Sequence, residues 1–142
     1  MRQSQGLAAA WREIRPAAIL GAPAAREIVQ VSDTKCLVVL CTCTEGAPAT
    51  RLAQALVEEK LAACVNRLPG VISSFRWEGR VEEERETLLL IKSTEDRLEA
   101  LTARITELHP YELPEVVAVP VLGGLDSYLD WLRDSVTPDP GP

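Results

Sequence analysis

Three stretches of this chain are apolar at nearly every position, and they restrict its fold more than any other feature. Residues 36–43, 88–91 and 116–121 are short and consist largely of Val, Leu, Ile, Ala and Cys. Such runs are typical of β-strands. Because successive side chains of a strand point to opposite faces, a sheet built from these strands is apolar on both faces and needs a cover on each.

Two amphipathic helices are predicted between the strands. The first covers residues 48–60 and begins with a proline, which suits the first turn of a helix. The second begins after Ser93 or Thr94, either of which can cap it, and ends at His109, because Pro110 cannot continue a helix. Their apolar residues recur three and four positions apart: Ala49, Leu52, Ala53, Leu56 and Val57 in the first helix, and Leu98, Leu101, Ile105 and Leu108 in the second.

The order of the remaining elements predicts the fold class. Residues 63–74 and 80–93 are two further strands around a turn at Glu78-Gly79, and residues 125–132 form a last short helix. The order β-α-β-β-α-β with a C-terminal helix is typical of the ferredoxin-like α+β sandwich, in which both helices cover one face of a four-stranded sheet. We expect this domain to span residues 35–136, with a poorly ordered extension at 1–34 and a flexible tail at 137–142.

The second face of the sheet is left without a cover by these elements, since no other predicted segment within the domain is long enough. An apolar surface of this extent requires one. We expect identical subunits to cover one another in a closed symmetric assembly. The alternative is that residues 1–34 fold over the sheet.

Composition excludes several classes of function. The 142 residues carry a net charge of −6 and are only 4% aromatic, which argues against a nucleic-acid partner. No apolar run approaches the roughly 18–20 residues that span a membrane. The four cysteines form no C-x-x-C motif and lie in apolar surroundings without a signal peptide, so we expect unpaired thiols in the cytoplasm. No catalytic motif is present, and we expect that the protein is not an enzyme.

A few side chains could bind metal. Cys41 and Cys43 lie on one face of a strand and could form half of a soft-metal site, or they could be buried core residues. His109 is the only histidine and is either a metal ligand or a helix-end residue without one. The acidic run from Glu78 to Glu86 could attract cations loosely, but a solvated strand edge is the simpler interpretation.

Six segments, spread over residues 36–133, together resemble the CutA divalent-cation tolerance family. They follow the family's order and share its motifs: Val38-Val-Leu-Cys-Thr42, Glu59-Lys-Leu-Ala-Ala-Cys-Val-Asn66, Pro69-Gly-Val-Ile-Ser-Ser-Phe-Arg-Trp-Glu-Gly79, Leu89-Leu-Ile-Lys92, Leu108-His-Pro-Tyr-Glu-Leu-Pro-Glu115 and Asp126-Ser-Tyr-Leu-Asp-Trp-Leu132. The resemblance implies a ferredoxin-like homotrimer that supports tolerance of divalent metals, copper foremost.

The resemblance also implies where ligands bind. Copper ligation carries over to Cys41 and His109, whereas Leu108 stands where the family's copper-binding example has another histidine. We therefore expect weak binding of copper or other divalent ions.

The family's trimer is similar to that of PII signalling proteins, which leaves a small-molecule sensor or interaction module as the alternative function. Its ligands would bind in clefts between subunits, and the candidate lining residues are Trp77, Lys92, Tyr111 and Glu115. The same four residues could instead serve only to pack the trimer.

Overall fold

A computed structural model describes residues 34–142 of the chain. The prediction for the N-terminal extension therefore lies outside the described residues, except at Thr34. In chain order the elements are β1 (Cys36–Thr44), α2 (Ala47–Glu58), β2 (Cys64–Trp77), β3 (Arg80–Thr94), a 3-10 turn (Glu95–Arg97), α3 (Leu98–Leu108), β4 (Val117–Pro120) and α4 (Asp126–Ser135). This order confirms the predicted α+β class with an extra C-terminal helix.

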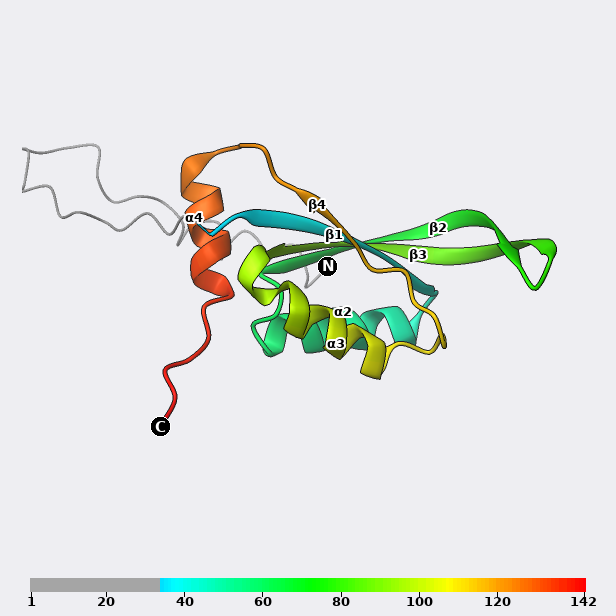
Figure 1. The fold of residues 1–142 in the computed structure, drawn as a ribbon, viewed down its shortest axis with the longest axis horizontal. Coiled ribbons are helices and arrows are strands. Elements are labelled where there is room, and N and C mark those ends of the chain that lie inside the picture. Colours follow the sequence, from blue (N-terminus) through cyan, green and yellow to red (C-terminus); the bar gives the residue numbers. More distant parts are fainter. Residues whose placement is uncertain (1–33) are drawn as a thin grey trace, which may run out of the picture. The chain divides into compact units, whose positions relative to one another are not determined.

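The four strands form one antiparallel sheet in the order β2-β3-β1-β4. β1 and β3 are central, as the ferredoxin-like pattern requires, and α2 and α3 lie together on one face (Figure 1). The start of α3 differs from the prediction. The Thr94 hydroxyl bonds the Asp96 carboxylate at 2.5 Å instead of capping the helix, because residues 95–97 form a 3-10 turn first.

The face of the sheet beneath α2 and α3, here called the inner face, carries the core. Val39, Cys41 and Cys43 alternate along β1 and are wholly inaccessible to solvent. Leu89 and Ile91 of β3 lie beside them, paired with Cys41 and Val39. Apolar residues of both helices complete the cluster: Ala49, Leu52, Leu56, Leu101 and Ile105.

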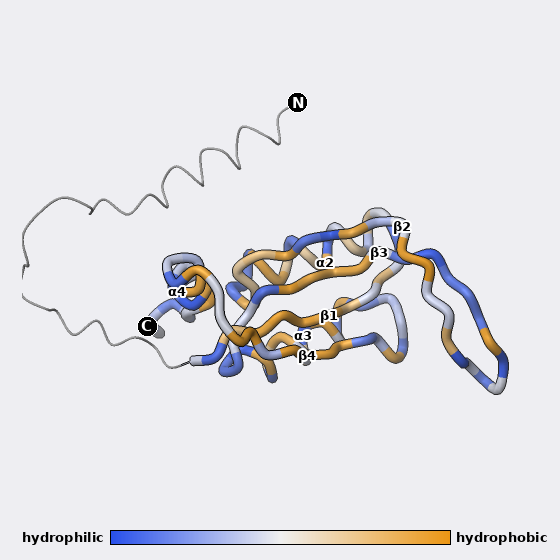
Figure 2. The backbone as a smooth tube through the Cα atoms, turned by 90° about the horizontal axis from the view of Figure 1, so that it is seen from above, coloured by the Kyte–Doolittle hydropathy of each residue, from blue (hydrophilic) through white to orange (hydrophobic). Residues whose placement is uncertain are grey.

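The opposite face, here called the outer face, is also apolar but stays largely open. Its central positions pair Leu40 with Leu90 of β3 and with Val117 of β4. Val117 and Val119 are 48% and 44% exposed. Figure 2 shows the hydrophobic character of β1, β3 and β4 in the sheet.

One end of the outer face is covered by α4, although we expected no segment of the domain to cover this face. Cys36 shares this face with Val38, yet it is only 3% exposed and its thiol lies 3.9 Å from the carbonyl oxygen of Leu129 in α4. Helix α4 lies against this end of the sheet (Figure 1). Val117 and Val119 stay exposed further along this face, so α4 covers only its end.

The β2–β3 hairpin continues beyond the helices as an arm, formed by residues 71–86 (Figure 1). The arm begins at an irregularity in β2 between Leu68 and Val71, which confirms the bend predicted at Pro69-Gly70. Gly70 has a φ of +78°, and its N–H donates to Glu45 at 2.8 Å. The same carboxylate accepts from Arg85 Nε at 3.2 Å, so the base of the arm is tied to the end of β1.

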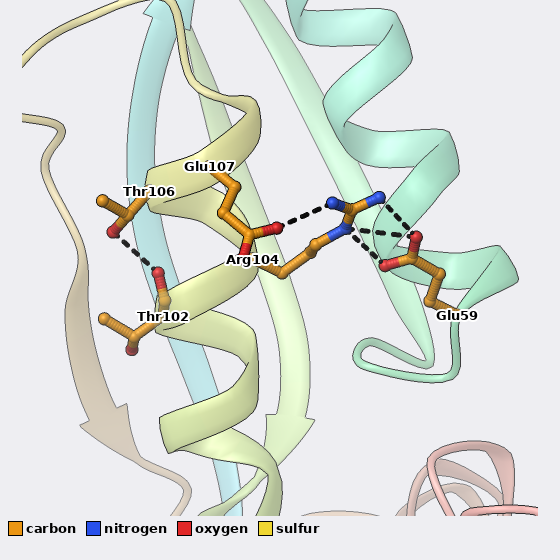
Figure 3. Close-up of polar contacts among 5 residues, drawn as sticks. All are labelled: Glu59, Thr102, Arg104, Thr106 and Glu107. Atoms are coloured by element: carbon orange, nitrogen blue, oxygen red, sulfur yellow. Dashed lines mark hydrogen bonds and ion pairs between the residues drawn. The ribbon is translucent and has the colours of Figure 1, made fainter.

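The two covering helices are joined by a charged contact. Arg104 of α3 donates through Nε and Nη2 to the carboxylate of Glu59, directly after α2, at 2.8 Å each, and through Nη1 to Glu107 (Figure 3). This forked geometry lowers the pKa of the Glu59 carboxyl, chiefly through the hydrogen bond from Arg104. The contact fixes the end of α2 against α3.

Candidate functional site

The single histidine is held in one orientation by two hydrogen bonds. His109 follows α3, and its Nε2 lies 2.8 Å from the carbonyl oxygen of Thr42. Its Nδ1 accepts the backbone N–H of Tyr111 at 3.0 Å. Because a carbonyl can only accept and a backbone N–H can only donate, the proton of the neutral ring resides on Nε2. Neither nitrogen is free to bind a metal without breaking one of these bonds.

The local strand pairing explains why His109 lies there. Carbonyls two residues apart in a strand face the same edge, and the Cys36 carbonyl accepts Val121 N–H at 3.0 Å on the β4 side of β1. The Thr42 carbonyl faces that edge too, but β4 pairs with β1 only from Leu37 to Leu40. The imidazole N–H therefore bonds the Thr42 carbonyl, where the backbone N–H of a longer β4 would otherwise donate.

Cys41 is buried directly beside this contact. Its thiol has no solvent exposure and lies 3.7 Å from the same Thr42 carbonyl oxygen. Burial raises the pKa of Cys41 to about 12, and the neighbouring Cys43, Glu115 and Glu86 add to the effect. The structure thus brings the two predicted metal ligands, Cys41 and His109, to one shared backbone atom.

A buried carboxylate lies at the same end of the sheet. Glu86 is 4% exposed and accepts the Tyr111 hydroxyl at 2.8 Å. Burial raises the pKa of this hydroxyl, partly opposed by a bond with Thr44. The Tyr111 ring also contacts the His109 ring, with centroids 4.7 Å apart.

Glu86 corrects the interpretation of the acidic run as a solvated edge. The run is exposed at Glu78, Glu83 and Glu84, whereas pairing with Thr44 of β1 buries Glu86. The sequence could have indicated this burial. Glu86 lies two residues before Leu88, so its side chain is on the same face of the strand as a row of apolar residues.

The four candidate cleft residues are not gathered within one subunit. Tyr111 and Glu115 belong to the segment that follows α3, and Glu115 is close enough to Cys41 to affect its pKa. Trp77 pairs with Arg80 at the tip of the arm, whereas Lys92 pairs with Cys64 at the other end of the hairpin. Trp77 and Lys92 can therefore share a cleft only if different copies contribute them.

A tight metal centre needs more donors than this site supplies. Within residues 34–142, no group of three or more His, Cys, Asp or Glu side chains is arranged to hold a metal ion. Cys41 and His109 are two donors, whereas a structural zinc site uses four. Their thiol and imidazole chemistry suits copper, and the number of donors suits weak, exchangeable binding.

Two hollows lie elsewhere on the helical side. The larger, of about 340 Å³, lies between α2 and β2 and is lined by Val57, Val65 and Arg67 among others. The second, of about 260 Å³, is lined by Leu52, Leu108 and Pro110 among others. Neither includes Cys41 or His109 in its lining.

Comparison with known proteins settles the family. The model of the CutA1 divalent ion tolerance protein family matches residues 37–135, which is most of the chain. The chain belongs to this CutA1 family. A relative named divalent-cation tolerance protein CutA, from Thermus thermophilus, is 50% identical over 98 residues, covering 69% of this chain and 95% of the relative. A chloroplastic CutA of Arabidopsis thaliana is 46% identical over 99 residues, covering 70% of this chain and 54% of the relative.

Solved CutA1 structures share the fold. The divalent cation tolerance protein of Thermus thermophilus superposes with a TM-score of 0.71 at 48% identity, covering 72% of this chain and 99% of that one. These matches confirm the CutA family predicted from the six sequence segments. Among the helices of the described part of this CutA1-family chain, none is both long and apolar enough to cross a membrane.

Proposed function

We propose that this CutA1-family protein supports tolerance of divalent cations in the cytoplasm, as a homotrimer that binds copper or other divalent ions weakly through Cys41 and His109. The observation that carries the proposal is the Thr42 carbonyl oxygen, which both side chains contact. A thiolate suits Cu(I), and an imidazole suits Cu(II) or Zn(II).

Two features of the geometry support weak rather than tight binding. His109 must give up a hydrogen bond to free one ring nitrogen, and Cys41 must lose a proton from a thiol whose pKa is about 12. The metal therefore competes with a proton and with internal hydrogen bonds. Leu108 supplies no second imidazole beside His109.

Titration of copper separates these two residues from the other thiols. We expect Cu(I), delivered against a competing chelator, to bind the wild-type protein and to bind Cys41→Ser and His109→Ala at least tenfold more weakly. Cys36→Ser is the matched control, because Cys36 is also buried but lies under α4 on the outer face. Equal affinity in all four proteins would remove Cys41 and His109 from the site.

The trimer in this proposal would cover the open outer face of the sheet. Leu68, Val117 and Val119 are exposed there, and apolar positions of β1 and β3 lie between them. β2 and β4 are also the edge strands of the sheet, and within residues 34–142 no strand pairs with their outer edges. Strands of further copies can cover the apolar face and pair with these free edges at the same time.

The cytoplasmic location rests on the thiols. All four cysteines are free, and three of them are buried. Unpaired thiols are typical of a reducing compartment. Cell fractionation tests this part of the proposal, and recovery of the protein in the periplasm or an organelle would contradict it. We further propose that the protein acts without catalysis, which a screen for substrate turnover would overturn.

A further inference from the structure

Both proposed metal donors are closed off from solvent. The Cys41 side chain is wholly inaccessible, and His109 is only 7% exposed. A metal ion or a small reagent can touch these side chains only after part of their cover moves away. Access to the proposed site is therefore a property of the element that covers it.

Residues 110–115, here called the strap, cover the site on the β4 side of the sheet, between α3 and β4 (Figure 1). The Cys41 thiol lies 3.7 Å from the Thr42 carbonyl oxygen, which faces this side at a point where β4 does not pair with β1. Glu115 of the strap is close enough to Cys41 to raise its pKa, and Val116, the next residue, packs against the core cluster that contains this thiol. The strap thus lies where a longer β4 would otherwise shield the thiol.

The strap is held by few hydrogen bonds. It belongs to no helix or strand, and within the described part of the chain its backbone groups bond no other backbone group. Pro110 and Pro114 have no N–H to donate. Its hydrogen bonds come from Tyr111, whose N–H donates to His109 Nδ1 at 3.0 Å and whose hydroxyl donates to the Glu86 carboxylate at 2.8 Å. A segment with so few backbone bonds opens at a lower free energy than the core beneath it.

Glu86 is the fixed end of this attachment. It is 4% exposed and belongs to β3, where it pairs with Thr44 of β1. The middle of the strap gains little from burial, because Glu112 and Leu113 are exposed to solvent. The hydrogen bond between Tyr111 and Glu86 therefore joins a loosely packed segment to the sheet.

We propose that the strap is a gate over Cys41 and His109, and that the hydrogen bond between Tyr111 and Glu86 holds it closed. The gate opens by local release of the strap, while the sheet and the two helices above it stay folded. The inference rests on the proposed function and adds how an ion reaches the buried donors. Opening also costs free energy that binding must supply, which lowers the affinity of the site.

Alkylation of the thiols tests the gate without any metal ion. Iodoacetamide modifies a buried thiol only while its cover is open, and where closing is fast the rate follows the population of the open form. Mass spectrometry of the peptides gives a separate rate for each cysteine. We expect Tyr111→Phe, which removes only the hydroxyl, to speed modification of Cys41 about tenfold, because the strap loses its bond to Glu86. We expect Cys36 to be modified at its wild-type rate, because it is buried under α4 at the start of β1.

Glu112→Ala is the matched control, because Glu112 is exposed and lies in the same strap. We expect this variant to keep the wild-type rate at both cysteines. An unchanged Cys41 rate in Tyr111→Phe would overturn the gate. An equal increase at Cys41 and Cys36 would also overturn it, because the fold would then have loosened as a whole, and so would an equal increase in Glu112→Ala.

Amide exchange of the wild-type protein provides a second readout, because Tyr111→Phe could fail to fold. The Tyr111 N–H exchanges only when its bond to His109 breaks. Once each rate is divided by that of an unfolded peptide, we expect Tyr111 exchange and Cys41 alkylation to give the same opening equilibrium within about threefold. Much stronger protection of Cys41 would mean that the thiol stays covered when the strap opens, and would overturn the gate. Neither readout uses copper, so failure of the gate leaves the metal proposal standing, and failure of the copper titration leaves the gate standing.

Discussion

The two faces of the sheet are built from the same strands but have different surroundings. Leu89 is wholly buried under the helices, whereas Leu90, the next residue, is only partly covered on the outer face. Each central strand thus supplies one apolar row to its own subunit and another that its own subunit leaves open. A strand that is apolar on both sides needs packing partners on both faces of its sheet. Its own sequence does not show whether those partners come from the same chain, because that depends on the chain's other elements.

Shortening a side chain on the inner face should cause the largest loss. We expect Leu89→Ala to reduce the free energy of unfolding by about 2–5 kcal/mol, because it leaves a cavity in a packed core. Urea unfolding followed by circular dichroism measures this, and the number of copies should not change. A loss below about 1 kcal/mol would show that the inner face is less tightly packed than the structure indicates.

A charge on the outer face should act on assembly instead. We expect Leu90→Asp to weaken association about a hundredfold, or about 2.7 kcal/mol, because it buries a carboxylate without a partner. Sedimentation over a dilution series measures the change, and Leu89→Ala is the comparison on the inner face. If Leu90→Asp assembles as tightly as wild type, the outer face has no cover and the two faces differ only in exposure.

Substitution of His109 tests how the segment after α3 is anchored to the end of β1. His109→Ala leaves the Thr42 carbonyl and the Tyr111 N–H without their side-chain partners, so we expect a loss of about 2 kcal/mol in unfolding free energy. Glu112→Ala, in the same segment but exposed, is the control and should have little effect. An equal effect of the two variants would mean that the histidine does not anchor this segment.

The effect expected to be smallest near neutral pH is the titration of Cys41 on the inner face, which sets in only in alkaline solution. Burial raises the pKa of Cys41 to about 12 in the folded protein, whereas an exposed thiol titrates near 8.5. The protonated thiol is favoured by folding, so its contribution is complete below about pH 8.5 and is lost as the pH rises toward 12. Thermal melting from pH 8 to 11 should therefore fall less steeply in Cys41→Ala than in wild type, and parallel curves would contradict the assignment.

Much of the fold could be predicted from local patterns, because strands and helices follow from periodicity that each segment carries in itself. Cys41 and His109 could be named for their chemistry, but not their shared contact with Thr42. That contact depends on β4 pairing no further than Leu40, which is a tertiary property. The burial of Glu86 likewise depends on its register with Thr44. The cover that α4 provides over Cys36 depends on where a short helix packs, which its own sequence does not specify.

The most direct test of a covered outer face is equilibrium sedimentation of the wild-type chain from high to low micromolar concentration. We predict a single species containing three copies of the 15.5 kDa chain, with no folded monomer in this range. A stable monomer with native circular dichroism would contradict the account, because its middle outer face, around Leu40 and Leu90, would then stand in water.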